Sequence, residues 1–73
     1  MRWKKGLIDY LSENLRRIDS ARYPGSELGW CVGEYIRMLD IPEDKRGTYH
    51  ARMAKVAYQW YLSKGRICNW DNI

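Results

Sequence analysis

The sequence predicts a mainly α-helical protein in which residues 1–73 form one compact domain of three helices with extended terminal segments. Apolar residues recur every three or four positions in three stretches, which is the spacing of one helical face. Pro and Gly separate these stretches, as expected at helix ends. The chain is 45% hydrophobic and holds four Trp and six Tyr, enough apolar volume for one small core.

The first predicted helix covers residues 5–20. Its apolar side chains recur on one face, at Leu7, Ile8, Leu11, Leu15 and Ile18. Charged residues such as Asp9, Glu13 and Arg17 fall on the opposite face, so the helix is amphipathic. We expect the apolar face to pack on the other two helices.

The second predicted helix covers residues 27–40 and follows a Tyr-Pro-Gly-Ser turn in which Ser26 is the expected N-cap. Its apolar stripe is wide, and we assign Trp30 to the core. Gly29 and Gly33 lie four residues apart, a spacing that favours the close approach of another helix over mere tolerance of two glycines.

The third predicted helix covers residues 48–64, because Pro42 separates it from the second helix and Gly47 interrupts the pattern. We favour a short turn at 42–46 followed by a helix capped by Thr48; one continuous helix is the alternative. The inward stripe is Tyr49, Met53, Val56 and Trp60, and the outward stripe is Arg52, Lys55, Gln59 and Ser63. The tail, residues 66–73, could be extended and pair with residues 2–4.

No catalytic, metal or cofactor site is predicted. The single histidine, His50, and two distant cysteines fit neither a nucleophile–base pair nor a zinc-binding spacing. We expect both cysteines to be reduced, with Cys31 a small core residue. No apolar run approaches the roughly 18 residues that cross a bilayer. The sequence therefore predicts a non-enzymatic, cytoplasmic binding protein without a membrane partner.

Charge alternates along the chain. Residues 1–24 hold six Lys or Arg and three acids, residues 25–44 hold one Arg and five acids, and residues 45–73 hold six Lys or Arg and one acid. Basic ends of this kind attract phosphates or acidic protein surfaces. The residues expected to make these contacts are Arg16, Arg17, Lys45, Arg46, Arg52, Lys55 and Gln59.

Trp3 and Trp70 lie outside the helical stripes, and each either covers the end of the core or anchors a partner. We select the second interpretation. The predicted partner-binding residues are Arg2, Trp3, Lys4, Lys5 and Trp70.

A 73-residue chain that starts at Met1, with basic ends, many Trp and Tyr and no catalytic set, resembles small phage-encoded regulators that bind bacterial RNA polymerase. This resemblance implies a monomer that docks on the polymerase and alters initiation or termination, with nucleic acid nearby. A small helix-turn-helix DNA-binding protein that uses Arg52, Lys55 and Gln59 is the alternative.

Overall fold

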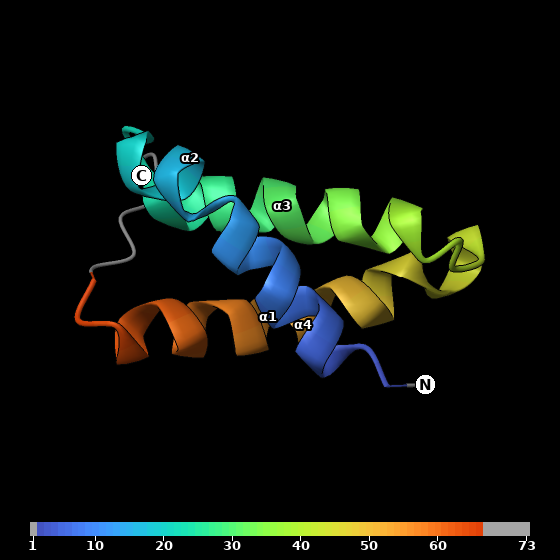
Figure 1. Ribbon diagram of the computed structural model, residues 1–73. Coiled ribbons are helices and arrows are strands. Elements are labelled where there is room, and N and C mark those ends of the chain that lie inside the picture. The colour runs from blue at the N-terminus through green and yellow to red at the C-terminus, as the bar shows by residue number, and fades with distance from the viewer. Residues whose placement is uncertain (1, 67–73) are drawn as a thin grey trace.

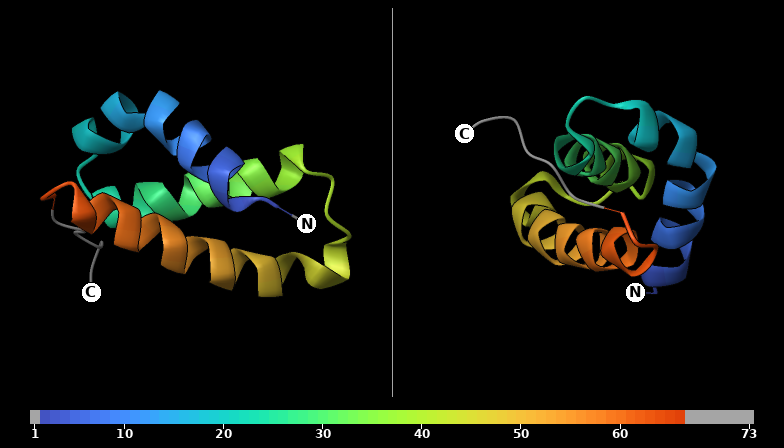
Figure 2. Two further views of the ribbon diagram at one scale, coloured as in Figure 1. Left: turned by 60° about the horizontal axis from the view of Figure 1, so that its bottom comes forward. Right: turned by 90° about the vertical axis from the view of Figure 1, so that its left-hand side faces the viewer.

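The computed structural model describes residues 2–66 and contains four helices within that range. They are α1 (Lys4–Glu13), α2 (Leu15–Ser20), α3 (Pro24–Met38) and α4 (Glu43–Ser63). Helices α3 and α4 run antiparallel, side by side, and α1 crosses one side of this hairpin (Figure 1). The end-on view shows α1 and α2 on the same side of it (Figure 2). The predicted mainly α-helical class is confirmed.

One apolar core lies where the helices meet. It takes Leu7 and Leu11 from α1, Ile18 from α2, and residues of α3 and α4 such as Leu28 and Met53, all fully buried. The inward stripe predicted for the last helix is confirmed, since Met53 is buried and the other three side chains pack partly buried against the core. Each helix is therefore held by its apolar face, as its periodicity predicts.

The first helix is not continuous over residues 5–20 as predicted. It breaks at Asn14, whose backbone (φ −105°, ψ 13°) leaves the helical range between α1 and α2. The Asn14 side-chain amide donates to the Tyr10 carbonyl at 2.8 Å. Asparagine competes in this way for backbone acceptors, and after the break α2 packs against α3.

The second helix begins earlier than predicted, at Pro24, and Tyr23 is its N-cap residue. Ser26 therefore lies inside the first turn, and the prediction that it caps the helix is wrong. Proline has no N–H to satisfy and its φ is already helical, so it suits the first position of a helix. The helix ends at Met38, and Asp40, within the connection to α4, adopts a positive φ of 58°.

The third predicted helix is also longer than expected, because α4 runs from Glu43 through Gly47 without a break. Thr48 is exposed within this helix and is not its cap. A helix-interior glycine costs only about 1 kcal/mol relative to alanine. The Arg46 guanidinium supports this first part of α4 by donating to the Ile41 carbonyl at 2.9 Å.

The ends of the described chain differ from the predicted strand pair. Lys4 already belongs to α1, with Trp3 as its N-cap, and residues 2–66 contain no strand. Apart from Arg66, the predicted tail, including Cys68 and Trp70, lies outside the described residues. Within residues 2–66, none of the helices combines the length and the apolar character that crossing a bilayer requires.

Candidate functional site

A groove runs along the surface between α3 and α4. Its larger part has a volume of about 560 Å³ and its smaller part about 300 Å³, and both are lined by Gly33, Arg37 and His50. Trp30 and Tyr58 line the larger part, and Arg46 lines the smaller. We call this surface the α3–α4 groove; it brings aromatic and cationic side chains from two helices to one site.

Glycines of α3 keep the groove open. A Cβ on Gly29 would meet only the Tyr58 hydroxyl, at 3.8 Å, and one on Gly33 would meet nothing within 4 Å. The prediction that these glycines bring a second helix close is therefore wrong at Gly33. The close approach occurs instead at Gly6 of α1, where a Cβ would collide with the Tyr35 hydroxyl and lie 3.2 Å from its Cζ.

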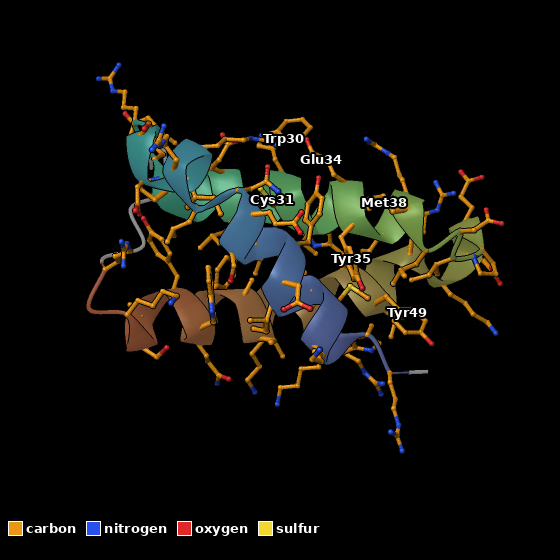
Figure 3. The ribbon with its side chains drawn as sticks, viewed as in Figure 1. Trp30, Cys31, Glu34, Tyr35, Met38 and Tyr49 are labelled. Atoms are coloured by element: carbon orange, nitrogen blue, oxygen red, sulfur yellow. The ribbon has the colours of Figure 1, made fainter. Side chains whose placement is uncertain are left out.

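Trp30 is on the surface of α3, where 66% of its area is exposed, and its assignment to the core is wrong. Its neighbours Leu28, Cys31 and Val32 occupy the buried face of α3. In Figure 3 the Trp30 side chain lies along the upper edge of α3, outside the packed layer between α3 and α4. A large exposed aromatic beside a groove is a typical anchor for a protein partner.

The far end of the α3–α4 groove is cationic. Arg37 is exposed and forms no ion pair within residues 2–66. After Arg17 and Tyr10, its charge is a further cause of the lowered pKa of Glu34. The Nε of Arg46 donates to the Ile41 carbonyl, and its terminal nitrogens have no hydrogen-bond acceptor within residues 2–66. The His50 Nε2 lies 3.2 Å from the Gly29 carbonyl, and since a carbonyl can only accept, Nε2 carries the proton. None of the described residues lining the groove is acidic.

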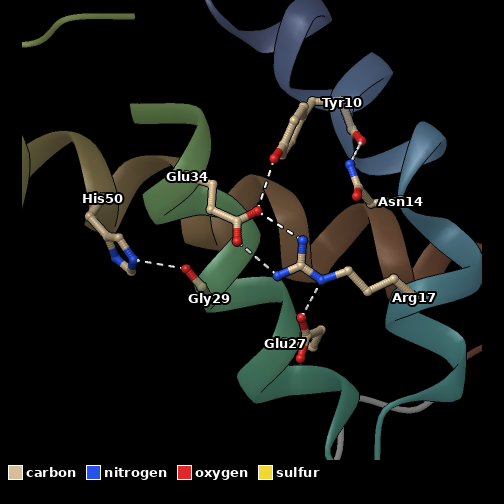
Figure 4. A network of polar contacts seen from close by, with 7 residues as sticks. All are labelled: Tyr10, Asn14, Arg17, Glu27, Gly29, Glu34 and His50. Carbon is tan, nitrogen blue, oxygen red and sulfur yellow. Dashed lines mark hydrogen bonds and ion pairs between the residues drawn. The ribbon is translucent and has the colours of Figure 1, made fainter. Parts of the chain in front are cut away.

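The other flank of α3 carries a closed polar network, formed by Tyr10, Arg17, Glu27 and Glu34 (Figure 4). The Arg17 guanidinium donates to both Glu34 carboxylate oxygens at 2.9 Å and through Nε to Glu27 at 2.5 Å. The Tyr10 hydroxyl donates to Glu34 at 2.9 Å. All three nitrogens of Arg17 are therefore engaged by carboxylates of the protein itself, and its predicted contact with phosphates or acidic surfaces stays a prediction.

Titration behaviour in this closed network follows from the same contacts. Hydrogen bonds from Arg17 and then Tyr10 lower the pKa of Glu34, whereas burial and the Glu34 carboxylate raise the pKa of Tyr10. A second polar cluster joins α2 to α4 and the residues after it. Arg66 donates to the Asp19 carboxylate at 2.8 Å, and the Tyr61 hydroxyl donates to the same carboxylate at 2.6 Å. These two bonds lower the pKa of Asp19.

The residues predicted as sites from the sequence are dispersed. Lys45, Arg52, Lys55 and Gln59 are exposed on α4, and the predicted outward stripe is confirmed. Four more predicted basic residues are exposed on or beside α1 and α2: Arg2, Lys4, Lys5 and Arg16. The Lys5 Nζ lies 3.9 Å from the Asp9 Oδ2. Trp3 is half-buried and packs against the core, which favours its covering role over the interface role. Of the predicted site residues that lie within positions 2–66, Arg46 alone lines the α3–α4 groove.

Trp30, Arg37 and His50 are absent from the site predicted from the sequence. A signal for two of them exists, because Trp30, Gly33 and Arg37 recur at helical spacing on the face opposite the apolar stripe. His50 carries no such signal, since its position beside Gly29 depends on the α3–α4 packing.

Other chemistry has little support in the described part of the chain. Residues 2–66 contain no group of three side chains able to hold a metal ion. Cys31 is buried and unbridged as predicted, and burial raises the pKa of its thiol to about 11. Comparison with protein-family models, curated proteins and solved structures finds no match to this chain.

Proposed function

We propose that this protein is a non-enzymatic binding domain that docks on a larger protein through Trp30 and the α3–α4 groove. The observation that carries the proposal is the exposure of Trp30 beside a glycine-lined depression. Trp and Arg are enriched among residues whose truncation costs about 2 kcal/mol or more at protein interfaces. Here Trp30 and Arg37 stand two turns apart on one helix and line the same groove.

The proposed partner is bacterial RNA polymerase, and the proposed effect is a change in the initiation or termination of transcription. This part rests on the size, charge pattern and aromatic content that the chain shares with small phage regulators. The partly buried position of Trp3 moves the proposed anchor from the N-terminal segment to α3.

Fluorescence anisotropy with purified bacterial RNA polymerase tests this proposal. The labelled protein weighs only 8.8 kDa, so its tumbling slows strongly on binding. We expect a saturable rise in anisotropy for the wild type. Trp30→Ala should weaken binding about thirtyfold, since loss of a central Trp anchor costs about 2 kcal/mol.

Leu62→Ala is the matched control, because Leu62 is also a large exposed apolar residue (55%) but does not line the groove. It should bind like the wild type. Absence of binding by the wild type, or equal weakening by both substitutions, would contradict the proposal. Helical circular dichroism of each variant establishes that the fold is retained.

Nucleic-acid binding by the outer surface of α4 is a second candidate function. It is favoured by the exposure of Arg52, Lys55 and Gln59 on one face. Helices α3 and α4 form an antiparallel hairpin (Figure 1). The two helices of a helix-turn-helix cross steeply instead, so this candidate interface is the outer surface of α4 and not a helix-turn-helix. Retardation of duplex DNA that decreases steeply with salt and is lost in Arg52→Gln/Lys55→Gln would support this function; no retardation at low salt would remove it.

A further inference from the structure

We infer that the segment received by the α3–α4 groove is an acidic peptide, with an apolar residue against Trp30 and a carboxylate at Arg37 and Arg46. This inference rests on the proposed docking function and specifies the chemistry of the partner at that site.

Charge complementarity favours a carboxylate at the far end of the groove. Arg37, Arg46 and His50 meet there around a volume of about 300 Å³, and the described lining residues include no acid. Arg46 is oriented by its bond to the Ile41 carbonyl. Guanidinium groups bind carboxylates through paired, charge-assisted hydrogen bonds. A carboxylate placed between the two arginines would therefore satisfy donors that form no ion pair within residues 2–66.

The charge around Trp30 favours a peptide over a nucleic acid. Glu27 and Glu34 stand three residues before and four residues after Trp30 on α3, and the two carboxylates share the single guanidinium of Arg17 as their ion-pair partner. A polynucleotide stacked on Trp30 would carry its phosphates past this acidic flank. Single-strand binding also needs a basic groove that follows the backbone, whereas Lys45, Arg52 and Lys55 lie on the exposed face of α4 and do not line the groove.

Helix geometry sets the spacing within the peptide. Trp30 and Arg37 are seven residues apart, which corresponds to about 10.5 Å along α3. An extended peptide advances about 3.3 Å per residue. The apolar and acidic residues of the bound segment should therefore stand about three positions apart.

A random 12-residue peptide library displayed on phage tests the inference against the immobilised wild-type protein. We expect enrichment of peptides with Asp or Glu about three positions from a large apolar residue. A synthetic selected peptide should bind at least tenfold more tightly than its analogue with Gln or Asn in place of the acids, the size expected for charged hydrogen bonds.

Two variants and one competitor decide the outcome. Arg37→Glu should weaken the selected peptide at least tenfold, whereas Arg52→Glu, the same charge change outside the groove, should alter binding less than twofold. Labelled single-stranded oligothymidylate should bind more weakly than the peptide. Selection without acidic residues, no selection at all, equal effects of the two variants, or preferred binding of the oligonucleotide would each overturn the inference.

The polymerase assay separates this inference from the proposed function. If wild-type protein binds RNA polymerase through Trp30 but Arg37→Glu binds equally well, docking stands and the acidic-peptide inference fails. If acidic peptides are selected and depend on Arg37 while polymerase is not bound, the chemistry of the groove stands and the polymerase proposal fails.

Discussion

The two flanks of α3 differ in how far their polar side chains are paired with one another. On the flank facing α1 and α2, Tyr10, Arg17, Glu27 and Glu34 bond to one another and form a closed network. On the flank facing the α3–α4 groove, Arg37 forms no ion pair within residues 2–66, and a Cβ on Gly33 would meet no atom within 4 Å. The first flank is closed by its own hydrogen bonds, whereas the second combines a surface depression with an arginine that forms no ion pair within residues 2–66.

Packing explains the difference. At the first flank α1 approaches α3 so closely that a Cβ at position 6 would displace the Tyr35 side chain. Glycine, which has no Cβ, fits there. At the second flank Gly33 has no neighbour within 4 Å of a potential Cβ. Glycine therefore has different structural effects on the two flanks. Gly6 permits close contact between α1 and α3, and Gly33 leaves a depression in the α3–α4 groove.

The largest expected effect comes from filling the closed flank at Gly6. Gly6→Ala places a methyl group against the buried Tyr35 side chain, and overpacking of this kind costs about 1–3 kcal/mol. Urea unfolding followed by circular dichroism measures the loss of stability. An unchanged unfolding midpoint would show that Tyr35 moves aside freely and that the contact is loose.

Arg17→Met should lower the free energy of unfolding by about 1 kcal/mol, because it removes bonds to two carboxylates in a partly exposed setting. Methionine keeps an apolar stem, so the change isolates the guanidinium. Arg16→Met is the matched control: Arg16 is exposed and forms no ion pair within residues 2–66. Equal stability of the two variants would contradict a stabilising role for the network.

The difference between wild type and Arg17→Met should also shrink in acid. Arg17 holds the pKa of Glu34 below its ordinary value of 4.5, so the folded state binds this proton less readily than the unfolded state. Stability from this carboxylate is complete above pH 4.5 and is lost as the pH falls through the lower folded-state pKa. Urea unfolding at pH 7, 5, 4 and 3 measures the difference, and a gap that stays constant to pH 3 would exclude Glu34 as its source.

The smallest effect, with the opposite sign, is expected on the open flank. Gly33→Ala should stabilise the protein by about 0.5–1 kcal/mol, because alanine is the better helix former and its methyl group meets no neighbour. The thermal midpoint should therefore rise slightly. A decrease would mean that the α3–α4 groove is closed in solution. The same variant narrows the groove, so its peptide affinity provides a second measure.

Periodicity was sufficient to predict the apolar faces but not the ends of the helices. Leu7, Leu11, Leu28 and Met53 are buried as predicted, since burial of an apolar stripe is dictated by spacing alone. The break at Asn14 and the start at Pro24 depend on local hydrogen bonding and on proline geometry. The continuous α4 follows because the hydrogen bonds of a long helix outweigh the modest cost of Gly47.

Prediction of the candidate site was less successful, because contacts between different helices decide which charged side chains form ion pairs. Arg17 and Arg37 look alike in the sequence, yet Arg17 is engaged by two carboxylates ten and seventeen residues away. The two tryptophans depend on tertiary packing in a similar way: Trp3 packs partly buried against the core, whereas Trp30, which we assign to the core from the sequence, is exposed on α3.

The sequence by itself determined the helical class, the apolar face of each helix and the outward row on α4, since these follow from residue spacing along one chain. Only the tertiary structure decided that Arg17 is paired, that Trp30 is exposed and that Arg37, Arg46 and His50 share a groove. Such properties depend on the distance between helices and on the direction from which one helix crosses another, and neither quantity is encoded in the spacing within a single helix.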